Sequence, residues 1–202
     1  MLKLAEYNRR PALLADYLPW ACLVAPGVIL NKDGSFQRSI QFRGPDLESA
    51  TESELVATCA RINNVLRRFG SGWALFFEAD RHPAGGYPSS EFPDPVSGLV
   101  DEERRSVFEQ SGTLFESSYF LTFVFLPSTE SVGRAEHLLI ETKEEKRGHD
   151  YREDLDRFIQ LTDRAIDLLS QLMPAAVALS DGETLTYLHG CISDRRLSVA
   201  VP

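Results

Sequence analysis

Short apolar runs alternate with longer amphipathic segments along the chain, and this alternation predicts both strands and helices. Runs that are apolar on both faces, or rich in β-branched and aromatic residues, predict strands. Segments in which apolar residues recur every three or four positions predict helices that bury one face. The expected strands lie at 28–30, 36–42, 73–80, 118–126 and 175–179, and the expected helices at 51–69, 96–108, 151–173 and 182–191. The order predicts an α+β fold, with a mixed or antiparallel sheet built from a β-hairpin and further strands and packed by amphipathic helices.

The segment from Asn31 to Ser35 joins the first two expected strands and contains residue types that nucleotide sites use. Asp33-Gly34 between two extended apolar segments is typical of a hairpin turn in which both turn residues accept a positive φ. A phosphate-binding loop would need more glycines and a helix directly after its lysine, whereas a strand is expected after Lys32. The sequence therefore predicts that this segment turns the chain and binds no nucleotide.

The helix expected at 51–69 carries clear local signals. Thr51 and Glu54 have the spacing of a capping box, and Gly70 is expected to follow the helix with a positive φ. Its apolar stripe consists of Leu55, Cys59, Ile62, Leu66 and Phe69. Because Cys59 lies on this stripe, we expect a buried apolar residue and not a nucleophile.

Residues 1–26 form an apolar and basic arm that precedes the α+β domain at 27–202. Pro11 and Pro19 bracket room for about two helical turns. Large apolar side chains do not stay exposed without a use, so the arm must cover its own domain, meet a partner protein or lie on a membrane. The candidate contact residues are Leu13, Leu14, Tyr17, Leu18 and Trp20.

The composition is that of a globular domain, with 202 residues of which 43% are hydrophobic and 25% charged. The net charge of −9 argues against direct contact with nucleic acid, which requires a basic face. Residues 1–44 have six Lys or Arg and three Asp or Glu, so a mildly basic arm precedes an acidic body. No stretch approaches the ~18 consecutive apolar residues of a membrane-spanning helix. Three widely separated cysteines fit the reducing cytoplasm.

No constellation of catalytic, cofactor-binding or metal-ligating residues is visible, and the sequence predicts none of the three. A phosphate loop and the GxSxG nucleophile motif are both missing, and the four histidines are scattered. An acid/base enzyme remains a second hypothesis, with a site around the Pro- and Gly-rich loop at 81–95 and nearby acidic residues, because such sites assemble only in space. A peripheral membrane module acting through the arm is a third. The segment 128–150 is highly charged towards its end and favours no single structure.

Three stretches carry a resemblance to a known family: "LAEYNRRPALLADYLPWACLVAPGVILNKDGSFQRSIQFRGPDLESAT", "GSGWALFFEADR" and "YPSSEFPDPVSGLVDEERRSVFE". Together they resemble the beginning of the conjugal transfer ATPases in the CagE/TrbE/VirB family of type IV secretion. In that family a membrane-associated N-terminal domain precedes a RecA-like ATPase domain that holds the phosphate loop. The resemblance implies that ATP and Mg²⁺ belong to an ATPase domain that this chain lacks, so no catalytic residue is carried over.

The resemblance also implies a function. The domain would attach an ATPase to inner-membrane subunits of a conjugation system and to other protomers, at the cytoplasmic face of the inner membrane. The full-length protein would power pilus biogenesis and DNA transfer. We therefore expect a phosphate loop downstream of Pro202.

Overall fold

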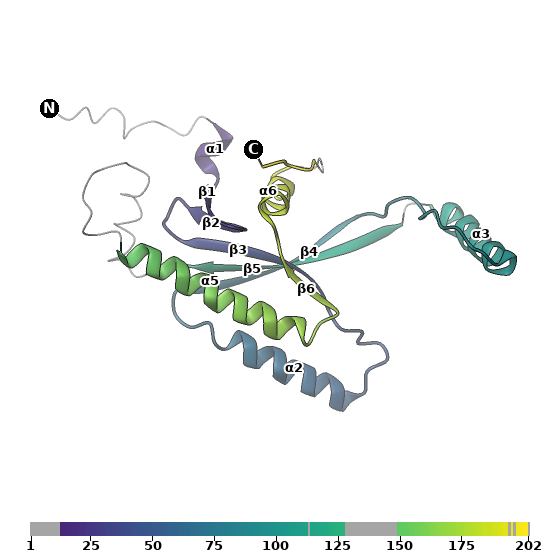
Figure 1. The fold of residues 1–202 in the computed structure, drawn as a ribbon, viewed down its shortest axis with the longest axis horizontal. Coiled ribbons are helices and arrows are strands. Elements are labelled where there is room, and N and C mark those ends of the chain that lie inside the picture. The colour runs from purple at the N-terminus through teal and green to yellow at the C-terminus, as the bar shows by residue number, and fades with distance from the viewer. Residues whose placement is uncertain (1–12, 113, 128–148, 194, 196, 202) are drawn as a thin grey trace.

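An antiparallel sheet of six strands lies at the centre of the computed structural model, which describes residues 13–112, 114–127, 149–193, 195 and 197–201 (Figure 1). The strands are β1 (Trp20–Ala25), β2 (Val28–Asn31), β3 (Phe36–Arg43), β4 (Trp73–Pro83), β5 (Phe115–Phe125) and β6 (Ala175–Ala178). The described helices are α1 (Leu14–Tyr17), α2 (Glu52–Leu66), α3 (Pro95–Gln110), α5 (His149–Ser170) and α6 (Asp181–Gly190). The predicted α+β class, with its hairpin and amphipathic helices, is confirmed.

The sheet order is β1-β2-β3-β5-β4, and β6 pairs with β3 beyond the end of β2. β5 therefore lies between two long neighbours, as its residues, apolar on both faces, predict. β1, β4 and β6 are edge strands, because each pairs with a single neighbour. The sequence predicted the interior position of β5 because only a strand covered on both faces can bury such a run.

The arm differs from its prediction. Among the described residues of the arm, 13–26, only Leu14–Tyr17 is helical, and Trp20–Ala25 is a strand that pairs with β2. The cause is Pro19, because a residue before proline is driven from the helical region. Leu18 accordingly has φ −77° and ψ 139°.

The hairpin between β2 and β3 is confirmed, but its turn differs from the expected one. Gly34 has φ +84°, and no described residue other than glycine has a positive φ. The Gly34 N–H donates to the Asn31 carbonyl at 3.0 Å, and the Asn31 N–H donates to the Ser35 carbonyl at 2.8 Å. These bonds define a three-residue loop, in which only the last residue needs the left-handed conformation.

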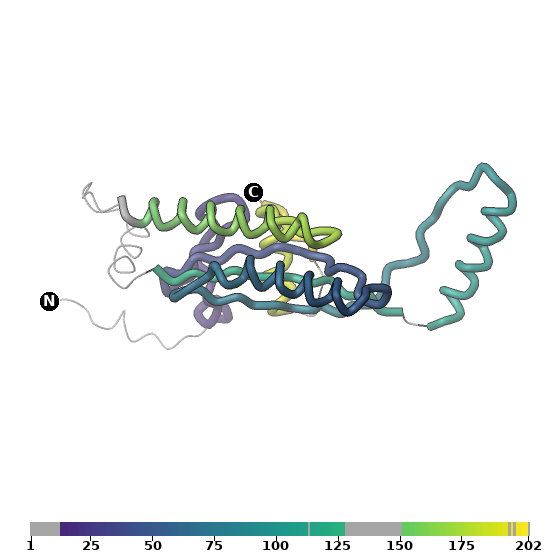
Figure 2. Tube along the Cα trace, turned by 90° about the horizontal axis from the view of Figure 1, so that it is seen from below, coloured from purple at the N-terminus to yellow at the C-terminus, as the bar shows by residue number. Residues whose placement is uncertain are grey.

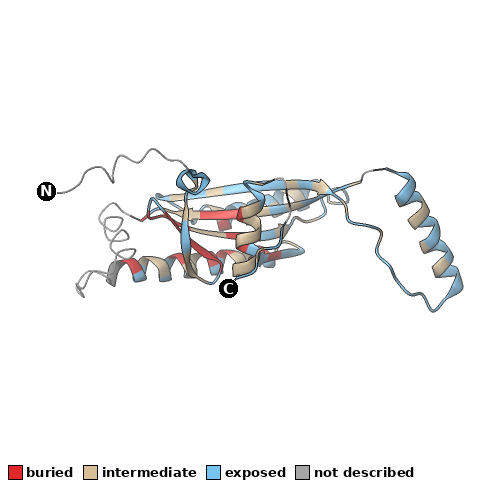
Figure 3. Cartoon of the chain, turned by 90° about the horizontal axis from the view of Figure 1, so that it is seen from above, coloured by how far each residue is buried: buried red, intermediate tan, exposed pale blue. Residues whose placement is uncertain are grey.

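One face of the sheet holds the hydrophobic core. Phe158 of α5 is completely buried and lies against Phe36 of β3 and Trp73 of β4, with ring centroids 5.6 and 5.4 Å apart. α2 packs beside α5. Figure 3 shows buried positions concentrated where α5 lies against the sheet.

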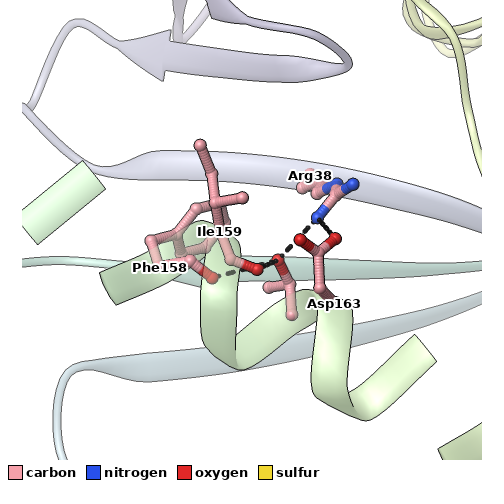
Figure 4. Close-up of polar contacts among 5 residues, drawn as sticks. Arg38, Phe158, Ile159 and Asp163 are labelled. Atoms are coloured by element: carbon pink, nitrogen blue, oxygen red, sulfur yellow. Dashed lines mark hydrogen bonds and ion pairs between the residues drawn. The ribbon is translucent and has the colours of Figure 1, made fainter. Parts of the chain in front are cut away.

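A polar contact also joins α5 to this face (Figure 4). The Arg38 guanidinium of β3 donates to Thr162 Oγ1 at 2.9 Å and to Asp163 Oδ1 at 2.6 Å. Arg38 is 12% exposed and Asp163 53%, so the ion pair lies at the margin of the core. Thr162 is fully buried, and its hydroxyl also lies 3.0 Å from the Phe158 carbonyl. This contact fixes the position of α5 along β3.

The helix expected at 51–69 is present as α2, with the predicted capping box at Thr51. Cys59, however, is exposed, and Val65 is the buried residue of this helix. At about 100° per residue, Cys59 lies at one flank of the apolar stripe, and the buried face of the helix is centred towards the opposite flank, where Val65 lies. The expected positive φ at Gly70 occurs instead at Gly72.

Between β4 and β5 the chain leaves the sheet in a long excursion that contains α3 (Figures 1 and 2). The Asp94 side chain caps the helix by accepting from the Ser97 N–H at 3.0 Å, and Pro95 occupies the first helical position. The loop 84–94 runs beside α3, and Tyr87 packs edge-on against Phe108 at 5.5 Å. The excursion therefore stands on its own local contacts away from the sheet.

Candidate docking surfaces

The arm presents three large apolar side chains to solvent. Leu13, Leu14 and Tyr17 are 68%, 62% and 68% exposed, whereas Leu18 and Trp20 are half-buried. Of the five candidate contact residues, three are thus exposed at one helical turn and two lie partly against the domain. A partner contact by these residues stays a prediction.

Lys32 holds the arm to the hairpin. Its backbone N–H donates to the Pro19 carbonyl at 2.7 Å, and its ammonium group donates to the carbonyl of Ala15 within α1. Asp16 caps that turn by accepting from the Leu13 N–H at 3.0 Å. The lysine that resembles a nucleotide ligand in the sequence therefore positions the arm.

A cavity of about 710 Å³ lies on the sheet face opposite α5, beneath α6. The Tyr187 ring of α6 packs tilted against Phe120 with ring centroids 4.6 Å apart, and its hydroxyl donates to the Glu78 carboxylate at 2.7 Å. Below it the buried hydroxyls of Ser39 and Thr122 lie 2.7 Å apart. Sequence spacing could not predict this cavity, because its walls come from three strands, α6 and the C-terminal segment.

Two ionisable side chains of the cavity, Tyr187 and Cys191, favour their protonated neutral forms. Burial, with the nearby Glu78 carboxylate, raises the pKa of Tyr187 well above its ordinary value. Although Cys191 as a whole is exposed, partial burial of its thiol and the same carboxylate raise its pKa as well. A thiol with a raised pKa is a poor nucleophile. The cavity therefore lacks an activated nucleophile at Cys191.

Among the described residues, the acidic side chains around the cavity are not grouped as a metal site. In the part of the chain that the structure describes, no three His, Cys, Asp or Glu side chains are grouped to hold a metal ion. His82 is paired with Glu116 at 2.9 Å, and the Arg81 guanidinium lies over the Phe115 ring at 4.7 Å. Residues 81–83, at the start of the loop expected to carry an enzyme site, line the cavity, whereas the later part of the loop bonds to α3, since the Tyr87 hydroxyl donates to Asp101 at 2.7 Å. Nothing here favours the enzyme hypothesis.

A second exposed apolar surface lies on α3. The residues on its outer side are Val96, Leu99, Val100 and Val107, all exposed. The opposite side of the helix faces Tyr87 through Asp101, Arg105 and Phe108. The helix was predicted from the sequence. The exposure of its apolar side, which has no neighbour in the described structure, was not predicted.

Comparison with known proteins identifies the family of the chain. Residues 27–132 match the family model for the N-terminal domain of the type IV secretion system ATPase VirB4/TrbE. The chain is 39% identical over 144 residues to a probable conjugal transfer protein TrbE of Sinorhizobium fredii, a match that covers 69% of this chain and 97% of that protein.

The chain belongs to the VirB4/TrbE family of type IV secretion ATPases and corresponds to its N-terminal domain. Two further members are longer. "Conjugal transfer protein TrbE" of Rhizobium radiobacter is 40% identical over 63% of this chain, and "Type IV secretion system protein virB4" of Brucella suis is 24% identical over 65%. Each match spans only 16% of the relative's own length.

The VirB4/TrbE match begins at Gly27 and includes the whole β4–α3–β5 excursion. The excursion is therefore within the family's N-terminal domain and is not an addition to it. α5, β6 and α6 follow the matched range, yet α5 completes the core. Among the described helices, none is both long enough and apolar enough to span a membrane.

Proposed function

We propose that this VirB4/TrbE domain is the assembly and docking domain of a conjugal transfer ATPase. It joins the motor to inner-membrane subunits of its secretion system and holds it at the cytoplasmic face of that membrane. The observation that carries the proposal is the arm, in which Leu13, Leu14 and Tyr17 are exposed on a helical turn that Lys32 holds in place. A pre-positioned apolar group loses little conformational freedom when a partner covers it.

The charge of the domain favours a protein partner over lipid. The whole chain carries −9, and anionic headgroups would repel most of its surface. The same charge argues against a role in wrapping DNA. ATP and Mg²⁺ are assigned to a RecA-like domain of the longer protein, which would supply energy for pilus biogenesis and DNA transfer while this domain supplies attachment.

Docking is tested by replacing Leu13, Leu14 and Tyr17 together with serine. Removal of the apolar contact should abolish co-purification of the ATPase with the inner-membrane subunits encoded beside it, and should lower conjugation frequency. The measurement is co-purification of the full-length protein from detergent-solubilised membranes, together with mating assays.

Val56→Ser on α2 is the matched control, because Val56 is also exposed and far from the arm in sequence. It should leave both assays unchanged. Unchanged capture by the arm variant would contradict the proposal. Flotation of the intact domain with anionic vesicles, lost in the arm variant, would instead identify a lipid anchor.

The isolated domain is expected to bind no Mg-ATP at micromolar concentration. It lacks a phosphate loop, and Lys32 is engaged by the Pro19 and Ala15 carbonyls. Calorimetric titration checks this result. Saturable binding that Lys32→Ala removes would show that the hairpin interpretation is wrong.

A further inference from the structure

The edge strands of the sheet differ in how they are protected, and β6 has only four residues. β1 has six residues, and its pairing with β2 is interrupted by two register shifts. Bulges of this kind twist an edge away from further pairing. β4 has eleven residues and pairs with β5 in one uninterrupted register from Trp73 to Pro83. β4 is therefore the longest edge strand and the regular one of the two ends of the sheet order, which makes it the edge best suited to accept another strand.

The hydrogen-bond pattern between β4 and β5 determines which backbone groups of β4 point away from β5. The Leu126 N–H donates to the Gly72 carbonyl, and the Ala84 N–H donates to the Leu114 carbonyl. Hydrogen-bonded pairs recur every second residue in an antiparallel ladder, so even-numbered residues of β4 bond to β5. The outward N–H and C=O groups belong to Leu75, Phe77, Ala79 and Arg81. Among the described residues, none bonds to these groups.

The side chains of β4 divide the edge into two halves. Trp73 to Phe77 carries no charge, and Phe76 and Phe77 are 58% and 57% exposed on opposite faces of the sheet. Glu78, Asp80 and Arg81 occupy the second half, and Pro83 ends it by removing an outward N–H. Charges and proline are the usual protection of an edge, and the apolar half has neither.

We propose that β4 pairs antiparallel with β4 of a second copy of this chain and continues the sheet across both copies. A two-fold axis normal to the sheet joins identical edges, so the outward N–H and C=O groups of each copy meet those of the other. This contact does not involve the arm and gives the docking domain a separate interface between protomers.

The charges of β4 select the register. A pairing centred on Glu78, Ala79 or Asp80 sets carboxylates directly opposite one another, which is destabilising. A pairing centred on Phe77 sets Leu75 opposite Ala79 and Phe76 opposite Glu78, and one centred on Phe76 sets Leu75 opposite Phe77. Both bring aromatic or aliphatic side chains together and keep the acids apart. The strand is thus self-complementary only around its apolar half.

Sedimentation equilibrium over a concentration series tests the pairing. The wild-type domain should dimerise, and more tightly at high salt, because salt screens the repulsion between two copies of charge −9. Ala79→Pro deletes one outward N–H and leaves the β5 ladder intact, so it should weaken dimerisation at least tenfold. Phe77→Lys should do the same, whereas Val56→Lys makes the same charge change on α2 and should not. Circular dichroism confirms that each variant is folded.

Cysteine crosslinking tests the register. With Cys22, Cys59 and Cys191 replaced by serine, Phe76→Cys or Phe77→Cys should form an intermolecular disulfide, because residues opposite at the two-fold axis have Cα atoms about 4.5–5.5 Å apart. Asp80→Cys should not. A wild-type domain that stays monomeric at every concentration, a dimer that Ala79→Pro does not weaken, or preferential crosslinking at Asp80→Cys would each overturn the proposal. The variant with serine at Leu13, Leu14 and Tyr17 should still dimerise, so docking through the arm and dimerisation through β4 are tested separately.

Discussion

Phe158→Ala is expected to lower the free energy of unfolding by about 3–5 kcal/mol, the range for removing a large aromatic side chain from a core. Phe158 has no exposed surface, stacks on Trp73 with an interplanar angle of 15°, and contacts Phe36. It therefore joins α5 to strands at two positions of the sheet. Equilibrium denaturation in urea measures the change.

Two further variants test whether the loss of stability comes from the buried volume of Phe158. Phe158→Leu keeps much of the volume and should have a smaller effect, whereas Val56→Ala, at an exposed position of α2, should have little. α5 follows the range that matches the family's domain, so the result also tests whether this helix belongs to the same cooperative unit. A loss below about 1 kcal/mol for Phe158→Ala, far under the core range, would show that it does not.

The strands and helices that bury one face or both could be predicted from the sequence. β5 is interior because its apolar residues face both ways, and α2 begins at Thr51 because the capping box satisfies its first N–H groups. β1 could not be predicted as readily. Its residues are exposed or half-buried, so they show no apolar alternation, and pairing with β2 determines their structure.

The candidate surfaces divide in a similar way. Leu13, Leu14 and Tyr17 are exposed, which agrees with the apolar residues of the arm having no place in the domain core. The Lys32 contacts that position them are not a local pattern, because Lys32 and its partners are 13 or more residues apart in the sequence. The cavity beneath α6 and the free edge of β4 depend on strand order, which local patterns do not encode. The residue types thus indicated which side chains need a neighbour, and the strand order determined where in the fold those side chains lie.

Gly27→Ala is expected to destabilise the domain through two effects. Gly27 has φ +67°, where a residue with a Cβ is strained by about 1–3 kcal/mol. An added Cβ would also lie 2.3 Å from the Leu179 carbonyl oxygen, so the backbone must move, and overpacking of this kind costs about 1–3 kcal/mol more. The Gly27 N–H donates to Asp181 at 2.6 Å, so the movement would also loosen the start of α6. Thermal and urea denaturation measure the loss.

Gly70→Ala is the matched control, since Gly70 has no positive φ and its Cβ would meet open space. It should be neutral or slightly stabilising, because alanine restricts the unfolded chain. The turn at Gly27 joins β1 and β2 to the β6–α6 junction, so Gly27→Ala should also increase amide hydrogen exchange in α6 more than in α2. Equal stability of the two variants would mean that the close approach of Gly27 to Leu179 does not exist in solution.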